Sequence, residues 1–348
     1  MPEAERSQTS DLLAAARSGD ERAFGALVEP HRRELRAHCY RMAGSIHDAD
    51  DLLQESLLRA WRGLAGFEGR ASLRTWLYRV CSNACIDLLQ ERSTRTLPTF
   101  QGEAADPRAP VPPPELDPIW LEPCPEAIWT DVALSPEATL SGKESVTLAF
   151  LAALQLLAPR QRAILIAREV LGMSAEDCAE LFETGVAAVN SALQRARQTL
   201  DERASKWRRA TKSEPAEPAT RALLARYVEA WEKADPQVLA SLLHEDATLC
   251  MPPLSIWLSG AEAIALSVGA MVLTPEARGA FRFLTTQANG LPALAAYRRT
   301  ESGEYAPNAL HLLEIDGDRI ATVTAFLDPS LFPSFELPER LSGANQNL

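Results

Sequence analysis

A row of carboxylates marks residues 47–63. The stretch HDADDLLQESLLRAWRG carries Asp48, Asp50, Asp51 and Glu55 within eight positions. Apolar residues recur at helical spacing through the same segment, so it predicts an amphipathic helix with the acids on its outer face. Like charges on one helix face repel each other. One explanation is that Asp48 caps the helix and that Asp50 and Asp51 lie in its first turn, where the helix dipole favours negative charge. The other is that the row is a docking surface for a basic partner.

Aromatic and basic side chains alternate in the next segment, FEGRASLRTWLYRV. They are Phe67, Arg70, Arg74, Trp76, Tyr78 and Arg79. Aromatic faces beside guanidinium groups suit the unstacked bases and the phosphates of a nucleic-acid single strand. Packing of Trp76, Leu77 and Val80 in a helical core explains the same pattern. For Trp76 both explanations stay open.

Residues 173–200, MSAEDCAELFETGVAAVNSALQRARQTL, have the pattern of a helix-turn-helix. Ser174 with Asp177 predicts a capping box, and Glu183-Thr184-Gly185 predicts the turn. The second helix is expected to point Val186, Val189, Leu193, Ala196 and Leu200 inward. Its outer face then shows Ala187, Asn190, Ser191, Gln194, Arg195, Arg197 and Gln198. Short polar side chains there can reach base edges in a major groove, and arginines suit phosphates. An ordinary helical hairpin is the alternative.

Four segments must position these residues. Residues 10–97 and 146–210 have helical periodicity and predict two all-α domains. Residues 98–145 are too proline-rich and acidic to form a packed core, and predict a linker. Residues 218–335 predict an α+β domain. It begins with helices over 219–234 and 236–244, and its strands ALAAYRR, ALHLLEID and RIATVTAFLD include a hairpin turn at Asp316–Asp318.

Composition narrows the classes of protein. The chain has 348 residues and a net charge of −12, with nine acidic and two basic residues between positions 100 and 146. No apolar run approaches the roughly 20 residues of a membrane span, and the N-terminus lacks a signal-peptide pattern. Cys81 and Cys85 can share a helix face, but two thiols do not make a zinc site. We therefore expect a cytoplasmic protein with reduced buried thiols and no membrane contact, metal or cofactor.

Together the first and third segments resemble the extracytoplasmic-function group of bacterial RNA polymerase sigma factors. The resemblance spans about 190 residues, in ERAFGALVEPHRRELRAHCYRMAGSIHDADDLLQESLLRAWRGLAGFEGRASLRTWLYRVCSNACIDLLQERSTR and LAPRQRAILIAREVLGMSAEDCAELFETGVAAVNSALQRARQTL. In that family the acidic helix docks on the clamp helices of the largest catalytic polymerase subunit. The resemblance implies that the polymerase-binding residues are Asp48, Asp51, Gln54, Glu55 and Arg59, with the carboxylates unpaired in the free protein.

The resemblance also implies two promoter contacts. The loop Phe67–Leu73 would receive a flipped base of the minus-ten element, flanked by the helix Trp76–Arg92. The implied residues are Phe67, Arg70, Arg74, Trp76, Tyr78, Arg79, Asn83 and Asp87. The helix-turn-helix would read the minus-thirty-five element as duplex through Ala187, Asn190, Ser191, Gln194, Arg195 and Arg197. Family members often carry arginine where this chain has Asn190 and Ala192, which leaves the base contacts open.

The fourth segment resembles the SnoaL-like branch of the nuclear-transport-factor-2 superfamily, a curved α+β cone around a pocket. The resemblance implies regulation in cis, by contact with the two sigma domains. A Trp-Leu-x-Pro motif in the linker and a site near the C-terminus are the expected contact points. Their residues are Trp120, Leu121, Pro123, Trp129, Asp328 and Pro329. Plain loop packing explains the second site equally well.

The polar residues near the predicted strands, Asp246, His311, Glu314 and Asp328, form no recognisable acid–base pair, so we expect no enzyme. A small ligand in the pocket stays open. The sequence predicts a transcription initiation factor, monomeric when free, whose partners are core RNA polymerase and promoter DNA. The alternative is a ligand-responsive, one-component helix-turn-helix regulator. Residues 47–79 favour the first reading, because a repressor has no use for a polymerase dock.

Overall fold

The computed structural model describes residues 3–90, 94–115, 120–129, 145, 147–204 and 217–342. The chain forms two compact units. The first comprises Met1–Thr94 and Ala127–Trp207, and the second comprises Arg95–Glu126 and Arg208–Leu348. No helix of the described residues is long and apolar enough to cross a membrane.

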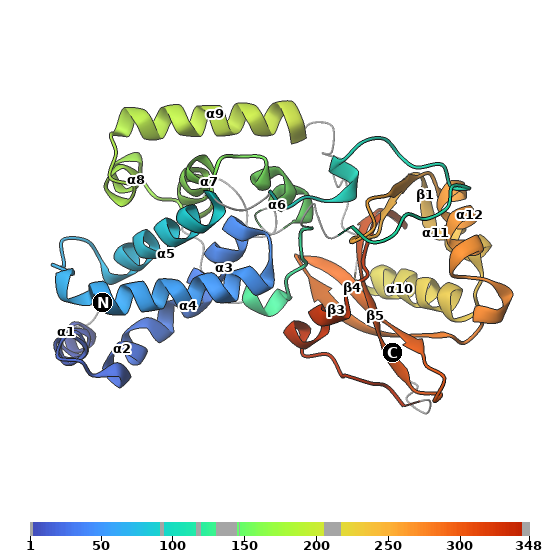
Figure 1. The fold of residues 1–348 in the computed structure, drawn as a ribbon, viewed down its shortest axis with the longest axis horizontal. Coiled ribbons are helices and arrows are strands. Elements are labelled where there is room, and N and C mark those ends of the chain that lie inside the picture. The colour runs from blue at the N-terminus through green and yellow to red at the C-terminus, as the bar shows by residue number, and fades with distance from the viewer. Residues whose placement is uncertain are drawn as a thin grey trace. The chain divides into compact units, whose positions relative to one another are not determined.

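Five helices open the first unit (Figure 1). They are α1 (Glu3–Arg17), α2 (Glu21–Val28), α3 (Arg32–Ala43), α4 (Ile46–Gly63) and α5 (Leu73–Gln90). The predicted amphipathic helix is α4, but the prediction that Asp48 caps it is wrong. The helix begins at Ile46, and the Ser45 side chain accepts a hydrogen bond from the Asp48 N–H at 3.0 Å. Ser45 has the extended backbone of an N-cap, so Asp48 lies inside the first turn.

Four more α-helices follow in the described part of the first unit. They are α6 (Leu148–Gln155), α7 (Pro159–Leu165), α8 (Ala175–Leu181) and α9 (Val186–Ala204), with one π-helical turn at Ile166–Val170. The capping box of Ser174 and Asp177 has both of its hydrogen bonds. Glu183, in the turn between α8 and α9, adopts a left-handed φ of +50°. Val186 is exposed rather than inward, because it stands in the first turn of α9.

The described part of the second unit contains three α-helices, several short 3₁₀ helices and one six-stranded sheet. The helices are α10 (Glu217–Glu232), α11 (Pro236–Leu242) and α12 (Ala261–Met271). The strands are β1 (Leu243–Cys250), β2 (Trp257–Ser259), β3 (Phe281–Ala288), β4 (Leu291–Arg299), β5 (Tyr305–Asp316) and β6 (Arg319–Phe326). The strand order is β2-β1-β6-β5-β4-β3, parallel only between β1 and β6. The predicted fold class, helical domains followed by an α+β domain, is confirmed.

The predicted helices and the hairpin of the second unit are present, and α12 was not predicted. Strands β5 and β6 are joined by the hairpin turn at the expected place, where Asp316 pairs with Arg319. The segment that forms α12 begins after Gly260, whose backbone carries no side-chain cap. Its composition is almost wholly apolar, so periodicity alone does not separate a helix from a buried strand there.

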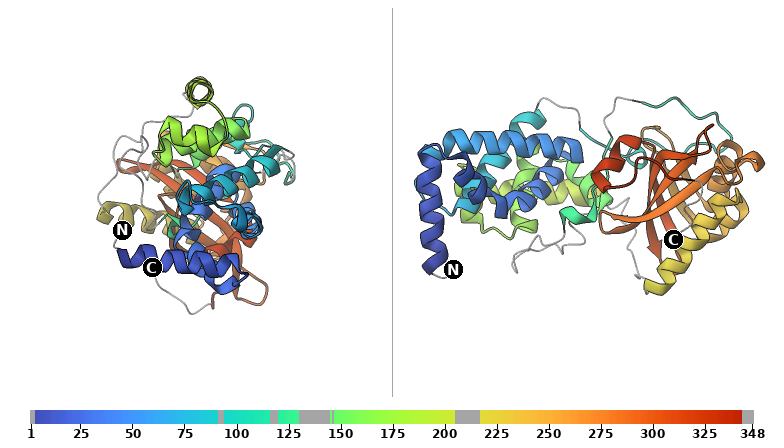
Figure 2. Two further views of the ribbon diagram at one scale, coloured as in Figure 1. Left: turned by 90° about the vertical axis from the view of Figure 1, so that its left-hand side faces the viewer. Right: turned by 90° about the horizontal axis from the view of Figure 1, so that it is seen from below.

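Helix α10 covers one face of the sheet (Figures 1 and 2) and brings a polar pair into the core. The Tyr227 hydroxyl on α10 lies 3.0 Å from His311 Nδ1 on β5, and both side chains are buried. The rings of Trp231 and Phe283 pack around the imidazole. Burial lowers the pKa of His311 to about 4, because the apolar surroundings disfavour the imidazolium. The buried side chain is therefore neutral at neutral pH.

This shift makes the second unit acid-sensitive. The unfolded chain binds a proton on His311 below its ordinary pKa of 6.5, whereas the folded chain does not until about pH 4. Stability is therefore complete above pH 6.5 and falls as the pH falls through this window, by about 2 kcal/mol between pH 7 and pH 5. Urea unfolding of the full chain should show this loss. His311→Asn, which cannot titrate, should remove it, and an equal loss in both proteins would contradict the assignment.

Candidate nucleic-acid and protein interfaces

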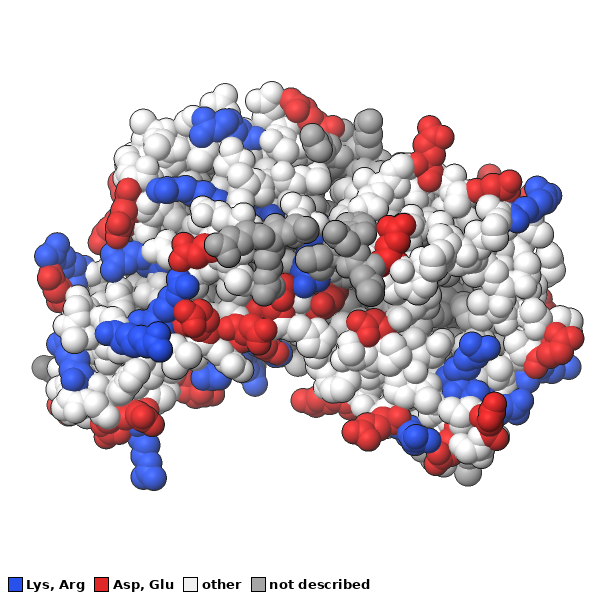
Figure 3. All heavy atoms as spheres, viewed as in Figure 1, with Lys and Arg blue, Asp and Glu red and all other residues white. Residues whose placement is uncertain are grey.

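The outer face of α4 presents one continuous exposed stripe. Its members are Asp51, Gln54, Glu55 and Leu58, spaced at three, four and seven positions, and we call them the α4 stripe. The apolar face opposite is buried at Ile46, Ala49, Leu53 and Ala60. Figure 3 shows acidic and basic side chains side by side over the part of the first unit where α4 lies. Leu58, at the C-terminal end of the stripe, is 50% exposed.

The carboxylates of this helix are not uniformly unpaired, which corrects the expectation. Arg59 Nε donates to Glu55 at 2.8 Å, and its Nη1 donates to Asp87 on α5 at 2.7 Å. Asp50 accepts a hydrogen bond from Arg36 Nη2 at 2.7 Å. These pairs relieve the repulsion between neighbouring acids, so α4 is stable with its stripe exposed. Arg59 thereby joins the α4 stripe to α5.

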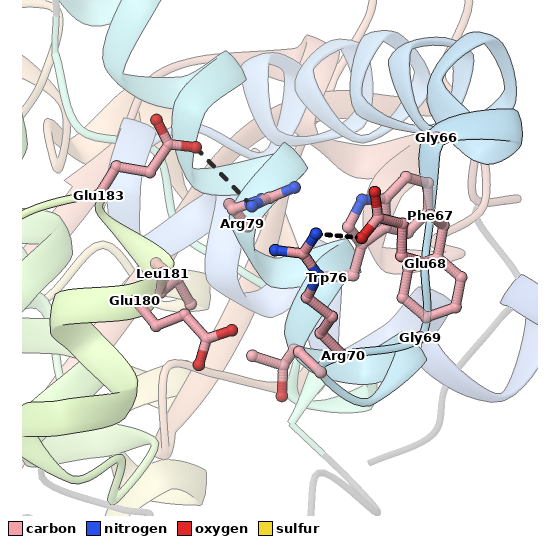
Figure 4. A pocket seen from close by; sticks show the side chains of 12 residues that line it. Gly66, Phe67, Glu68, Gly69, Arg70, Trp76, Arg79, Glu180, Leu181 and Glu183 are labelled. Carbon is pink, nitrogen blue, oxygen red and sulfur yellow. Dashed lines mark ion pairs between the residues drawn. The ribbon is translucent and has the colours of Figure 1, made fainter.

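A pocket of about 380 Å³ lies where the loop before α5 faces α8 (Figure 4). We call it the α5 pocket. Its lining residues are Gly66, Phe67, Glu68, Gly69, Arg70, Ala71, Thr75, Trp76, Arg79, Glu180, Leu181 and Glu183. The structure thus brings together Phe67, Arg70, Trp76 and Arg79, four of the predicted minus-ten residues. The remaining wall comes from the helix-turn-helix, which sequence reasoning did not anticipate.

Aromatic rings and ion pairs shape this pocket. Phe67 and Trp76 are each 7% exposed, and their ring centroids lie 5.1 Å apart. The rings therefore pack on each other, which supports the core reading of Trp76. Arg70 pairs with Glu68, and Arg79 Nη1 lies 3.7 Å from Glu183 Oε1 (Figure 4). Both cations that line the pocket are held by carboxylates of the same chain.

Two predicted contacts, Tyr78 and Arg74, are hydrogen-bonded to Glu34, and of the two only Tyr78 is buried. Tyr78 is 1% exposed and its hydroxyl donates to Glu34 at 3.3 Å, so its ring cannot stack on a base in this structure. Arg74 Nε donates to the same carboxylate at 2.8 Å. Burial alone would raise the pKa of Glu34, but hydrogen bonds from His31 and Arg74 outweigh it and lower that pKa. Glu34 is therefore an anionic anchor for Arg74.

The other half of α5 offers Arg79, Asn83 and Asp87 along one face, at successive four-residue steps. Asn83 and Asp87 are exposed, and Arg79 is partly exposed. This face continues from the α5 pocket toward the ion pair between Asp87 and Arg59. It is a surface that a nucleic-acid strand could follow beyond the pocket.

The predicted outer face of α9 is exposed throughout. Its residues are Ala187, Asn190, Ser191, Gln194, Arg195 and Arg197. Arg195 Nη1 donates to Ser191 at 2.9 Å, and Arg197 pairs with Glu169. Ala192 is buried, so it belongs to the inner face and is not a place where a base contact has been lost. The basic positions Lys206, Arg208, Arg209 and Lys212 lie outside the described residues.

The predicted linker contains ordered segments that pack on the second unit, contrary to the expectation from its composition. Glu115 N–H donates to Pro253 O at 2.9 Å, and Ser255 Oγ donates to the Glu115 carboxylate at 2.8 Å. Trp120 is buried, and its Nε1–H donates to Glu115 O at 2.9 Å. Leu121 and Pro123 are buried with it. The Trp-Leu-x-Pro motif is therefore part of a folded segment, residues 120–126, which we call the strap.

This strap ends on the turn between β3 and β4. Asn289 and Gly290 both have left-handed φ angles, +55° and +73°, as a two-residue hairpin turn requires. The Asn289 side-chain oxygen accepts from Cys124 N–H at 2.8 Å, and Asn289 N–H donates to Cys124 O at 3.0 Å. Gly290 N–H donates to the Glu126 carboxylate at 2.9 Å. We call Cys124–Glu126 on this turn the linker anchor.

The remaining regulatory candidates lie in different surroundings. Trp129 belongs to the first unit, where its ring packs against Tyr40 at 5.5 Å and beneath the Arg41 guanidinium at 4.6 Å. Asp328 caps the short helix Pro329–Phe335, accepting from Ser330 N–H at 2.9 Å. The cap accounts for Asp328 and Pro329 by local packing within the second unit.

Two residues of these surfaces were missed from sequence. Leu58 was overlooked because a single leucine in an amphipathic helix reads as core. Its position seven residues after Asp51 was the available signal. Asn289 was overlooked although Asn-Gly between two apolar runs is a strong hairpin signal. Its contact with Cys124 spans 165 positions, which no local pattern encodes.

Comparison with known proteins follows the same division of the chain. The Sigma-70 region 2 family matches residues 27–95, and the Sigma-70 region 4 family matches residues 147–200. The ECF RNA polymerase sigma factor SigG of Mycobacterium tuberculosis is 45% identical over 334 residues, covering 94% of this chain and 86% of that protein. SigM of the same species is 31% identical over 191 residues, covering 55% of this chain and 82% of that protein.

A solved structure shares the fold. The crystal structure of the Mycobacterium tuberculosis extracytoplasmic function sigma factor SigJ matches with a TM-score of 0.55 and 20% identity. The match covers 88% of this chain and 97% of that chain. The coverage extends through both compact units, so the α+β unit is part of the shared fold.

The α5 pocket predicts a measurable charge effect. Replacing its two carboxylates, Glu180→Gln with Glu183→Asn, should tighten binding of a single-stranded DNA oligonucleotide by about five-fold, equivalent to about 1 kcal/mol. Asparagine tolerates the left-handed backbone at position 183, so the turn should survive. Fluorescence anisotropy on the full chain measures the affinity. Glu176→Gln, an exposed α8 carboxylate outside the pocket, is the matched control, and unchanged or weaker binding would contradict the prediction.

Proposed function

The chain belongs to the extracytoplasmic-function RNA polymerase sigma factors, and from that premise we propose how its surfaces divide the work. The α4 stripe docks on core polymerase, the α5 pocket takes the single-stranded minus-ten element, and α9 reads the minus-thirty-five duplex. The second unit regulates these steps in cis through the linker. Sigma factors are transcription initiation factors, so promoter choice rather than catalysis is the activity.

The α4 stripe is the observation that carries the polymerase dock. It combines the exposed acids Asp51 and Glu55 with a half-exposed leucine, Leu58. An exposed apolar side chain beside charged ones is typical of a protein-binding surface. The acids would steer a basic helix into place, and Leu58 would supply the apolar contact that water cannot replace.

Ion pairs support a closed free state at the α5 pocket. Arg79 is held by Glu183 of the helix-turn-helix, and Glu180 lines the same wall. Exposed ion pairs of this kind contribute about 1 kcal/mol or less, so they can be exchanged. We infer that polymerase binding moves the helix-turn-helix from this wall and that promoter phosphates then replace the carboxylates. Promoter binding by the free protein would be weak for this reason.

The linker anchor supports regulation in cis. The chain leaves the second unit at Glu126 and enters the first at Ala127, two residues before Trp129 packs on Tyr40 and Arg41 of α3. Glu126 is held on the β3–β4 turn within the second unit, and Trp129 is held on α3 within the first. A change in the second unit would reach the sigma regions through this short segment. A small ligand for the second unit and a monomeric free state remain predictions.

The rival reading, a one-component repressor, is not favoured. The region 2 match at residues 27–95 and the SigG relationship over 94% of the chain both assign the first unit to the sigma factors. A repressor needs only the helix-turn-helix and a sensor, and would leave the α4 stripe without a role.

Charge reversal in the α4 stripe tests the polymerase dock. Asp51→Arg with Glu55→Arg should abolish run-off transcription with core polymerase, because the stripe would repel the basic partner. Glu262→Arg with Glu276→Arg makes the same charge change on exposed acids of the second unit and should leave transcription intact. Transcription at the unmodified rate by the α4 variant would contradict the dock.

Leu58, the apolar residue of the α4 stripe, has a matched control in the same chain. Leu58→Ala should weaken binding to core polymerase by about ten-fold, because a leucine contact buried at an interface is worth roughly 1–2 kcal/mol. Leu266→Ala removes a similarly exposed leucine from α12 and should have no effect. Both affinities can be measured by titration of labelled protein with core enzyme. Equal affinities would place the contact elsewhere.

The linker anchor is tested at the β3–β4 turn. Asn289→Gly keeps the left-handed turn but removes the side-chain acceptor for Cys124 N–H, so the strap should come loose. We expect promoter-directed transcription to change by several-fold, with hydrogen exchange of residues 120–126 accelerated. Asp318→Gly, in the exposed turn between β5 and β6, changes a turn residue away from the linker anchor and should behave like the unmodified protein. Accelerated exchange without any change in transcription would contradict regulation through the anchor.

A further inference from the structure

Three cysteine thiols meet in the core of the first unit. Cys39 comes from α3, and Cys81 and Cys85 come from successive turns of α5. The Cys39 and Cys81 sulfurs lie 3.1 Å apart, and the Cys39 and Cys85 sulfurs lie 4.0 Å apart. All three sulfurs lie within 4.8 Å of one another, and all three residues are fully buried. From sequence only Cys81 and Cys85 were expected to meet, which excluded a metal site.

We propose that this thiol triad binds one soft monovalent cation, copper(I), in three-coordinate geometry. Thiolates are soft ligands that select copper(I) or zinc. Structural zinc requires four ligands, and no fourth histidine, cysteine or carboxylate joins the triad among the described residues. A metal about 2.3 Å from three sulfurs in a plane holds them about 4 Å apart. The Cys39 and Cys85 sulfurs already have that spacing, and the Cys39 and Cys81 sulfurs, at 3.1 Å, would have to move apart.

A buried cation beside the triad supplies a second, independent argument. Arg162 of α7 is 3% exposed, and its guanidinium donates to neutral oxygens, at Gln155, Leu157 and Met42. No carboxylate pairs with it among the described residues. A buried charge without a counter-charge is unfavourable. The positive charge of Arg162 interacts with Cys85 and favours the thiolate form of that side chain.

A copper–thiolate centre carries net negative charge and would balance this arginine. The hydrogen bonds of Arg162 to the end of α3 and to the α6–α7 corner fix it in place. Arg162, the cation that would balance the copper–thiolate centre, is therefore held in place by the fold and is not a mobile surface side chain. The cation would tie α3 to α5, the helix that carries the α5 pocket. The site is separate from the polymerase and promoter surfaces, so it can be tested without transcription.

The test uses the full-length chain, reduced and handled without oxygen. Copper(I), added as its acetonitrile complex against the chelator bicinchoninate, should be retained at one ion per chain. X-ray absorption should show a shell of three sulfurs. The apparent unfolding equilibrium should shift toward the folded state, by about a hundred-fold when free copper(I) exceeds its dissociation constant a hundred-fold.

Variants identify the ligands. Cys39→Ala, Cys81→Ala and Cys85→Ala should each lose the ion to the chelator, while Cys178→Ala and Cys250→Ala, which remove buried thiols elsewhere, should retain it. The X-ray measurement on the unmodified chain needs no variant, so a folding defect cannot hide the answer. Loss of copper from the unmodified chain, a shell of fewer than three sulfurs, or retention by all three triad variants would overturn the proposal. A Cys39–Cys81 disulfide formed in place of metal binding would overturn it equally.

Discussion

The ion pair between Arg79 and Glu183 is the interaction on which the account of the first unit depends. It joins the helix that carries the α5 pocket to the turn of the helix-turn-helix. Glu183 holds a left-handed backbone at that turn, so the carboxylate is positioned by local geometry. Because both partners are exposed, the pair is weak and exchangeable. A strong buried pair would lock the pocket, whereas this one can yield to a phosphate.

A second exposed ion-pair network links the two proposed surfaces of the first unit. Arg59 contacts Glu55 of the α4 stripe and Asp87 of α5, so the proposed polymerase dock and the promoter face share one guanidinium. A partner that recruits Glu55 would leave Arg59 and Asp87 to rearrange. Arg59, Glu55 and Asp87 thus form one contact network that spans the two proposed surfaces. The linker anchor holds the linker on the β3–β4 turn of the second unit through hydrogen bonds to the Asn289 side chain, the Cys124 carbonyl and the Glu126 carboxylate.

Local patterns made much of the fold predictable. The apolar period of α4, the capping box of Ser174 and the hairpin at Asp316 each depend on residues within a few positions of one another. The site features that could not be predicted depend on contacts between residues far apart in the sequence. Glu34 accepts hydrogen bonds from Tyr78 and Arg74 across 40 or more positions, and Cys39 reaches Cys81 across 42. Asp48 failed differently, because a better cap, Ser45, stands three residues before it.

The central claim is that the free protein must open at the α5 pocket before it can start transcription. Arg79→Cys with Glu183→Cys places two reactive thiols across the pocket in a chain whose native cysteines are all buried. A short bismaleimide should join them, and the joined protein should bind core polymerase yet fail in run-off transcription. Each single variant treated with the same reagent should remain active. Transcription by the joined protein at the rate of the single variants would contradict the account.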